Sequence, residues 1–345
     1  MRHALSPGAV VDVSLPFSVN TPLVEGALFL PAPYPLLMTP ALAAEAAVSP
    51  YAGPLVPAAV GYHQFDLTLP EGLQLVTPGL QGDPELLEGG LQRVEAEPGL
   101  VRAPALAAGV FEETGLTAGE VQLHAWTLPA HSVEAESLLE DAAAQMDILG
   151  GFWGVYPYTE LHLVDVPGRP AQGWPAMLVV GTFGTNTALE AVLQGVAQQW
   201  TVGLTASDPL EEPWISEAFT LYANALYYEN ALGIGAATGF LSDVRAVLRE
   251  SGLAAEPVGQ PADAFDSPTQ YTLLTGYKGA LLLESLRWQM GRTAFFTFMA
   301  DVFEQHRFGW ISGDDLQAAA EQACACSLDD LFDLWVREGG PLDTP

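Results

Sequence analysis

The stretch Val192–Tyr222, which reads VLQGVAQQWTVGLTASDPLEEPWISEAFTLY, decides how this sequence folds. Its apolar residues recur at helical spacing on both sides of a turn that contains Asp208 and Pro209. The pattern predicts one helix over Thr187–Leu204 and a second helix over Trp214–Asn230. Both helices carry polar residues within their apolar pattern, and these residues are the candidate site positions.

Two kinds of sequence surround this stretch. Residues 1–128 are rich in Pro and Gly and hold short alternating or β-branched runs, which predict a mostly β, sandwich-like domain. The strands expected there are Val10–Pro16, His63–Leu69, Leu73–Pro78 and Val121–Leu128. Residues 129–345 predict a mainly α domain with a small sheet. The predicted fold class is therefore α+β, in two domains.

The second domain should contain two short strands and a series of helices. Ser132 can cap a helix over Val133–Leu149, and Gly150-Gly151 would end that helix. The other expected elements are strands Glu160–Val166 and Met177–Thr182 and helices Thr238–Glu250, Thr272–Met290 and Thr293–Gln305. The last two helices should start at capping boxes, formed by Ser312 with Asp315 and by Ser327 with Asp330.

The charge balance is strongly acidic, with 42 Asp+Glu against 11 Lys+Arg and a formal net charge of −31. Such a surface repels phosphate backbones and anionic headgroups, which argues against nucleic-acid and membrane-surface binding. Solubility is the simple explanation of the acidity, and a basic partner is the alternative. Four prolines within Gly26–Ala44 exclude a spanning helix there. The opening MRHALSPGAVVDV lacks a signal-peptide pattern, which predicts a cytoplasmic protein.

The two cysteines, Cys324 and Cys326, are separated by a single residue. This spacing is poor for a disulfide and supplies at most half of a metal site. We therefore expect two partly buried thiols rather than a redox or metal centre.

Several short motifs in the decisive stretch resemble the core of the aminopeptidase-N-like zinc metallopeptidases, or gluzincins. That family carries H-E-x-x-H-Q-W, followed at fixed spacing by a Glu in W-[LI]-x-E-[GA]-F. Gln199-Trp200, Asp208-Pro209, Glu212-Pro213-Trp214 and Glu217-Ala218-Phe219 stand at the matching positions, and the spacing from Gln198 to Glu217 is that of the family. The resemblance implies an N-terminal β domain, here apparently shortened, followed by a thermolysin-like domain.

The residues that carry zinc chemistry in that family are replaced here. Two His ligands and a Glu ligand hold Zn²⁺ there, and the Glu after the first His activates the bound water. In this chain Gln194 and Gln198 occupy the two His positions, and Gly195 occupies the position of the base. Only the third ligand position, Glu217, is retained, and no His pair elsewhere has i, i+4 spacing. An amide is a weak ligand, so we expect zinc to be absent.

Two further family positions have also changed. Aligning Trp174-Pro175 with the family's amine-anchor motif puts Gly173 where the anchoring Glu would stand. Gly276 occupies the position of the Tyr that stabilises the transition state. Tyr277 is one residue away and is expected to face elsewhere on its helix.

The joint loss of ligands, base, anchor and Tyr within a retained framework predicts a pseudo-peptidase that binds protein or peptide. A partner or second subunit is expected to cover the shortened β domain. An active aminopeptidase with an atypical metal site is the alternative, and an assembly component whose cleft is irrelevant is a third reading. The simplest alternative is a purely structural role, in which the Glu217 carboxylate and the helix glutamines only make local hydrogen bonds. The ancestry predicts that Gln194→His, Gly195→Glu and Gln198→His together restore zinc, provided the backbone spacing is preserved.

Overall fold

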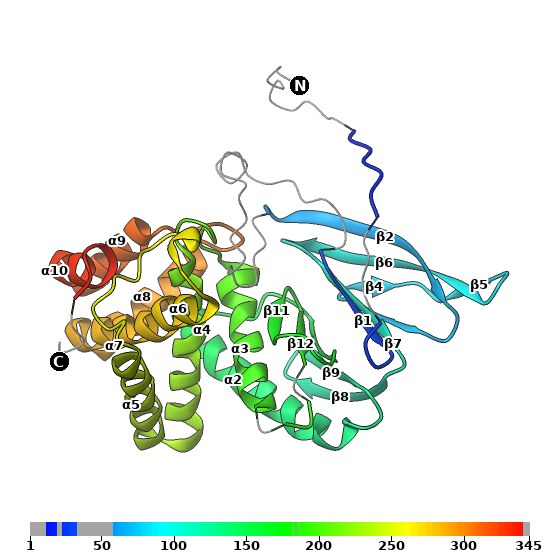
Figure 1. Cartoon of the computed structure of the whole chain (residues 1–345), viewed down its shortest axis with the longest axis horizontal. Helices are drawn as coiled ribbons and strands as arrows, with labels where there is room; N and C mark the ends of the chain where they lie inside the picture. Colours follow the sequence, from blue (N-terminus) through cyan, green and yellow to red (C-terminus); the bar gives the residue numbers. More distant parts are fainter. Residues whose placement is uncertain (1–11, 19–22, 33–57, 182, 186, 341–345) are drawn as a thin grey trace.

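Two small antiparallel sheets make up the N-terminal part of the fold (Figure 1). The computed structural model describes residues 12–18, 23–32, 58–181, 183–185 and 187–340. The first sheet has the order β1-β7-β3, and the second has the order β2-β6-β4, with β5 paired to β6. The strand bounds are β1 (Ala27–Pro31), β2 (Gly61–Pro70), β3 (Gln74–Val76), β4 (Leu80–Gln81), β5 (Glu85–Leu87), β6 (Leu91–Val101) and β7 (Ala105–Gly109).

A five-stranded mixed sheet begins the second part, in the order β11-β12-β10-β9-β8. Strands β9, β10 and β12 are parallel to one another, while β8 and β11 run antiparallel to their neighbours. Their bounds are β8 (Glu112–Ala118), β9 (Val121–Thr127), β10 (Glu160–Asp165), β11 (Gln172–Trp174) and β12 (Met177–Val180). The antiparallel edge strand β11 lies against helix α3.

One helix, α2, lies between β9 and β10, and the others follow the sheet to the end of the described chain. They are α2 (Ala135–Trp153), α3 (Ala188–Gln198), α4 (Pro213–Tyr227), α5 (Ile234–Ser251), α6 (Pro268–Tyr271), α7 (Gly279–Met290), α8 (Arg292–Gln305), α9 (Gly313–Cys324) and α10 (Asp329–Phe332). Several continue into, or are preceded by, π-helical turns, including η2 (Gln199–Leu204) and η5 (Thr272–Lys278). No helix within the described part of the chain is long and apolar enough to cross a membrane.

The mixed sheet joins the two parts because both of its faces are buried. Leu123, Ala125 and Leu178 face the helices and belong to the large core of the second part. Val164 and Val179 belong instead to a core that also contains Phe29 of β1 and residues of β3 and β7. The N-terminal sheets are thus packed on the same framework that positions α3.

The α+β class is confirmed, with strands in the first part and mostly helices in the second. Strands over His63–Leu69, Leu73–Pro78 and Val121–Leu128 are confirmed as β2, β3 and β9. The predicted strand Val10–Pro16 is wrong for residues 12–16, which are not in a strand, and residues 10 and 11 lie outside the described chain.

The sequence predicts a domain boundary at residue 128, whereas the strand pairing changes from the N-terminal sheets to the mixed sheet between β7 and β8. Strands β8 and β9 pair with each other and then with β10, so both belong to the mixed sheet of the second part. The two N-terminal sheets end at Gly109. Alternating apolar residues predict that a strand exists, but they do not say which sheet it joins.

Two predicted helix signals behave differently in the structure. Helix α2 continues through Gly150-Gly151 to Trp153 and ends at Gly154, whose φ of 93° only glycine adopts readily. The capping box of Ser312 with Asp315 is confirmed at α9. The second box is wrong, because α10 has Leu328 at its N-cap and the Ser327 hydroxyl bonds Asp329.

The prediction for the cysteines is also wrong. Cys324 and Cys326 form a disulfide at the end of α9, with Cα atoms 5.2 Å apart. Ala325 between them has a φ of 50°, in the left-handed region. This backbone conformation brings the two Cα atoms within disulfide range, which an extended i, i+2 pair would not reach.

Candidate ligand-binding cleft

A cleft of about 240 Å³ opens between α3, α4 and the segment α6–η5. It brings together five of the seven positions that the sequence singled out: Gln194, Gln198, Glu217, Gly276 and Tyr277. Its other lining residues are Ala171, Thr220, Leu221, Pro268, Tyr271 and Thr272. Gly173 and Gly195 do not line the cleft but lie behind it, at the contact between α3 and the sheet.

Glu217 is the one carboxylate that lines this cleft among the described residues. Helix α4 carries it, and the Tyr271 hydroxyl donates a hydrogen bond to its Oε1 over 3.3 Å. Burial raises the pKa of Glu217 to about 7, and the Tyr271 hydrogen bond offsets part of that rise. Among the described residues that line the cleft there is no cationic side chain to lower this pKa again.

Sequence reasoning missed Tyr271, which is buried and positioned by the short helix α6. The Ser267 hydroxyl accepts the backbone N–H of Gln270, and Pro268 occupies the first helical position. Ser-Pro-Thr-Gln at these positions has the form of a helix N-terminal signal. That signal would have placed Tyr271 in the first turns of a helix, although not against Glu217.

The amide of Gln198 is engaged by the neighbouring strand. Its Oε1 accepts the backbone N–H of Gly173 in β11 over 2.5 Å. Gln198 thus holds the edge strand against α3 with the oxygen that would have to face a metal. The position that supplies a His ligand in the resembling family has become a structural link.

Gln199 makes a second link of the same kind. Its Oε1 accepts the backbone N–H of Ala176 over 2.8 Å, and its Nε2 donates to the Gly195 carbonyl over 3.0 Å. The side chain is fully buried. Two successive glutamines therefore fasten the end of α3 to the β11–β12 turn.

Close packing explains the two glycines behind the cleft. A Cβ on Gly195 would lie 2.8 Å from Cβ of Leu178, which is closer than carbon atoms pack. A Cβ on Gly173 would lie 2.6 Å from Cβ of Gln198 and 2.7 Å from the Gly195 carbonyl. Neither site has room for the Glu side chain that would serve as base or amine anchor. The Gly195→Glu part of the triple substitution would therefore have to displace Leu178. The predicted return of zinc depends on positions 194, 198 and 217 and stays a prediction.

Gly276 and Tyr277 lie in the π-helical turn η5, and both line the cleft. The expectation that Tyr277 faces elsewhere is wrong. The physical reason is that a π-helix turns less per residue than an α-helix, so it changes which side chains share a face. At Gly276 the nearest atom to an added Cβ would be Leu221 Cδ2, at 4.0 Å, so a larger residue fits there.

The residues present do not fit the zinc that the resemblance implies. Across the described chain, no three His, Cys, Asp or Glu side chains are grouped so that they could hold a metal ion. At the site itself one carboxylate faces one amide that is open to the cleft and a second amide that is bonded to Gly173. Catalytic zinc sites use three protein ligands, usually including His nitrogen.

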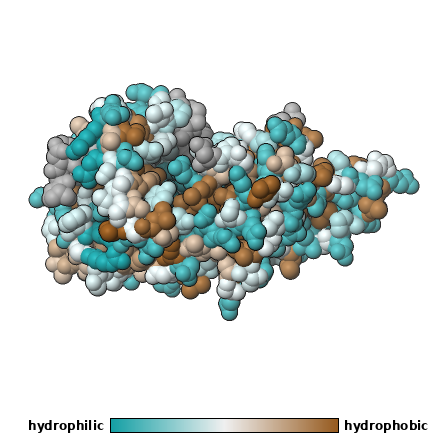
Figure 2. All heavy atoms as spheres, turned by 90° about the horizontal axis from the view of Figure 1, so that it is seen from below, coloured by the Kyte–Doolittle hydropathy of each residue, from teal (hydrophilic) through white to brown (hydrophobic). Residues whose placement is uncertain are grey.

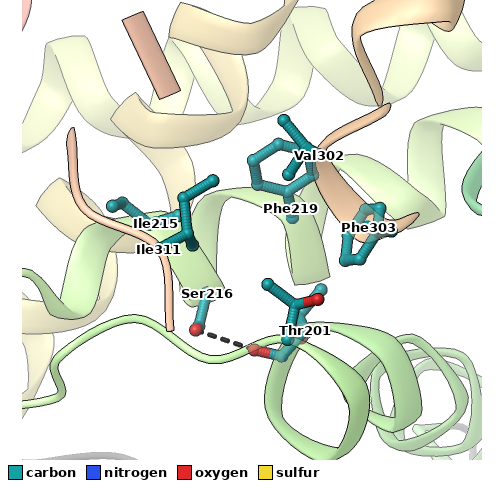
Figure 3. A pocket seen from close by; sticks show the side chains of 8 residues that line it. Thr201, Ile215, Ser216, Phe219, Val302, Phe303 and Ile311 are labelled. Atoms are coloured by element: carbon teal, nitrogen blue, oxygen red, sulfur yellow. Dashed lines mark hydrogen bonds between the residues drawn. The ribbon is translucent and has the colours of Figure 1, made fainter. Parts of the chain in front are cut away.

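A second cavity on the other side of α4 is a packing void. It measures about 10 Å³, roughly the room for one water. Figure 3 shows its apolar lining, with Ile215, Phe219 and Val302 pointing inward. The Ser216 hydroxyl donates to the Thr201 carbonyl over 2.8 Å and so is already satisfied. This void offers no group for binding or chemistry.

The fold matches solved zinc metallopeptidases. The M1 zinc metallopeptidase from Deinococcus radiodurans matches with a TM-score of 0.67 and 21% identity, over 83% of this chain and 66% of that chain. A mutant of that organism's M1 zinc metallopeptidase matches with a TM-score of 0.67 and 20% identity, over 83% of this chain and 67% of that chain. The mutant bound to a Tyr-Ser-Ala substrate matches with a TM-score of 0.67 and 20% identity, over 83% of this chain and 66% of that chain. This chain thus spans about two thirds of the length of those proteins.

These likenesses place the fold in the class of two-part metallopeptidases of the M1 type. Residues 185–335 also match the family model described as the Peptidase family M1 domain. The match to an M1 peptidase domain therefore covers part of the chain, and the matched range includes α3, α4 and the cleft between them. No curated protein sequence matches the chain.

Proposed function

We propose that this protein is a non-catalytic relative of the M1 peptidases, whose cleft binds a protein or peptide without cleaving it. The observation that carries the proposal is the contact between α3 and the sheet. Gly195 lies against Leu178 where a catalytic base would need a long side chain, and the Gln198 oxygen is bonded to Gly173. The positions of base, anchor and second ligand are thus used for packing.

Catalysis by a zinc peptidase needs several groups that act on the same atoms. The metal polarises the carbonyl and supplies a hydroxide, and a carboxylate takes the proton. Glycine at position 195 has no side chain for proton transfer, and the two amides at 194 and 198 are weak ligands. An open cleft with both apolar and polar walls is retained, so binding is the activity that the remaining residues support.

Metal content and turnover test this proposal together. The protein is purified without chelators, and its zinc is measured by plasma mass spectrometry before and after equilibration with zinc and dialysis. We expect less than stoichiometric zinc in both samples and no hydrolysis of an alanine aminocoumarin substrate or of Tyr-Ser-Ala, the tripeptide named in a relative's complex. One tightly held zinc per chain with turnover would overturn the proposal in favour of an atypical active site.

Binding in the cleft is tested by a variant that fills it. Gly276→Phe places a ring in the cleft, where a Cβ meets nothing nearer than 4.0 Å. Gly235→Phe is the matched control, on the exposed surface of α5 with nothing within 4 Å. We expect calorimetric binding of short peptides by the wild type and the control, and loss of binding in Gly276→Phe. Equal binding by all three would place the peptide elsewhere.

A protein partner on the N-terminal part and a cytoplasmic location belong to the same proposal. The strong negative charge suits a partner with a basic surface. Figure 2 shows a face on which apolar side chains lie among hydrophilic ones, so its hydropathy marks no single patch for that partner. Light-scattering mass and co-purification test this point. A stable monomer that retains nothing would contradict it.

A further inference from the structure

The disulfide between Cys324 and Cys326 lies outside the cleft lining, at the end of α9. Figure 1 shows α9 and α10 at the end of the molecule away from the N-terminal sheets. Cys326 is exposed and Cys324 is half-buried. The chain has no other cysteine, so neither sulfur has another partner within it. The pair is therefore accessible to thiols in solution.

This disulfide contributes little to the stability of the fold. A disulfide stabilises mainly by closing a loop in the unfolded chain, and the effect grows with the number of residues enclosed. Here only Ala325 lies between the two cysteines. The turn from α9 to α10 also has its own support. The Glu321 carboxylate accepts the backbone N–H of Leu328 over 2.8 Å, and the Gln317 amide donates to Asp329 over 2.9 Å.

The closed pair also requires an unfavourable backbone conformation. Ala325 has a φ of 50° and a ψ of 41°, in the left-handed region that residues with a Cβ rarely adopt. Glycine is the usual residue at such a helix C-terminus. Breaking the S–S bond frees Ala325 to leave this conformation. Exposed or strained disulfides are reduced more readily than structural ones and are the ones that serve catalytic or regulatory roles.

We propose that Cys324 and Cys326 form a reversible dithiol–disulfide couple that exchanges with thiols carried on neutral or cationic molecules. This inference is independent of the proposed binding function of the cleft. The charge around the pair sets the preference for the partner. From Gln317 to Asp333 the sequence holds acidic residues and no Lys, Arg or His. Arg337, beyond this segment, is already paired with Asp333 over 2.7 Å. An anionic thiol is therefore repelled, and a cationic one is attracted.

The surroundings of the two sulfurs indicate which one is attacked. The Cys324 sulfur lies 3.6 Å from the carbonyl oxygen of Glu321 and 3.6 Å from that of Cys326. These oxygens carry partial negative charge and oppose the approach of an anion, so the incoming thiolate attacks the sulfur of the exposed Cys326.

The exchange then proceeds in two balanced steps. A new S–S bond forms between the incoming sulfur and Cys326, the bond to Cys324 breaks, and Cys324 leaves as a thiolate that takes a proton from water. A second thiolate attacks the incoming sulfur of this mixed disulfide, and Cys326 leaves and is protonated in turn. Two external thiols are oxidised to one disulfide, and the protein pair is reduced by two electrons.

The couple is tested on the folded full chain by its response to glutathione. The chain is equilibrated with mixtures of reduced and oxidised glutathione and trapped with N-ethylmaleimide, and the adducts are counted by mass. We expect a species with two adducts to form reversibly, with its midpoint inside the range of glutathione ratios found in cells. A folded chain that stays oxidised throughout that range would overturn the proposal, because structural disulfides behave in that way.

Three small thiols test the preferred charge of the partner: cationic cysteamine, neutral 2-mercaptoethanol and anionic 3-mercaptopropionate. Reduction rates are expressed per thiolate and divided by the rates with the uncharged disulfide of 2-mercaptoethanol. We expect the normalised rate of cysteamine to exceed that of mercaptopropionate at least about tenfold at low ionic strength, and added salt to remove most of this difference. Equal normalised rates at low ionic strength would overturn the preference for neutral or cationic partners.

Two sets of variants complete the test. Asp330→Asn removes an exposed charge near the pair, and Asp301→Asn removes one from the exposed face of α8. We expect the first variant to lower the ratio of cysteamine to mercaptopropionate rates at least about twofold and the second to leave it unchanged. The double variant Cys324→Ser with Cys326→Ser should lose the glutathione response and unfold at nearly the wild-type temperature. A large loss of stability in this double variant would identify the disulfide as structural and overturn the proposal.

Discussion

At the scale of single residues, Glu217 links stability to pH. Its pKa is raised from 4.5 to about 7 in the folded chain, so between these values the folded state binds more protons than the unfolded state. The stabilisation that protonated Glu217 contributes is therefore fully present below pH 4.5 and is lost as pH rises through about 7. The loss amounts to at most about 3 kcal/mol, and to less where cleft water screens the carboxylate. Thermal unfolding of wild type and Glu217→Gln at pH 5 and pH 8 measures it, and a midpoint difference that does not change with pH would contradict it.

Two glycines of the site region respond to substitution in opposite ways. Gly195→Ala pushes a methyl group into Leu178, which should lower the free energy of unfolding by about 1–3 kcal/mol. Gly276→Ala has space on the cleft side and restricts the unfolded chain, so it should be neutral or stabilise by up to about 1 kcal/mol. Urea denaturation of both variants measures the contrast. A tolerated Gly195→Ala would contradict this and would mean that α3 can move away from the sheet.

Sequence reasoning located five of the eleven residues that line the cleft but not their contacts. The spacing from Gln198 to Glu217 was sufficient, because a fixed number of residues on two packed helices fixes which positions meet. It could not show that Gln198 bonds the backbone of Gly173, because that bond depends on the distance between α3 and β11. It also could not place Tyr277, because nothing in the apolar pattern distinguishes a π-helical turn from an α-helical one.

At the scale of elements, the junction of α3 with the β11–β12 turn depends on buried amides. Gln199→Leu keeps the volume and leaves the buried N–H of Ala176 without its acceptor. An unsatisfied buried donor costs about 1–3 kcal/mol, so we expect a stability loss of that size. Gln305→Leu, on the exposed end of α8, is the matched control and should change little. Hydrogen exchange at Ala176 should accelerate in the first variant, and unchanged protection there would refute a linking role.

The helices themselves were predictable because their apolar faces repeat every three to four residues, as over Ala188–Gln198 and Arg292–Gln305. Their ends were less predictable. Gly150-Gly151 did not stop α2, because packing of that helix in the core outweighs about 1 kcal/mol of intrinsic cost per glycine. Burial in the core, and not the helix propensity of the two glycines, thus determines where α2 ends.

At the scale of the whole molecule, Arg102 joins the N-terminal sheets to the helical part. It is 1% exposed at the end of β6, and its guanidinium donates to the carbonyls of Ala58 and Gly309, each over 2.9 Å. The same group lies 4.5 Å from the ring centroid of Trp310. Nothing in the sequence marked this residue, because its partners are backbone carbonyls and one of them lies more than two hundred positions away.

Removal of this link should let the two parts unfold more independently. Arg102→Met keeps the apolar stem and leaves both carbonyls without their charged donor. This should cost about 3–6 kcal/mol in total, since hydrogen bonds to charged groups contribute about 1.5–3 kcal/mol each. Arg93→Met is the control, because Arg93 pairs with Asp66 and Glu95 on the exposed face of β6, where ion pairs contribute about 0–1 kcal/mol. We expect calorimetry to show a lower and broader or divided transition for Arg102→Met and an almost unchanged one for Arg93→Met. A single sharp transition at the wild-type temperature for both variants would show that the shared core around the mixed sheet holds the parts together without Arg102.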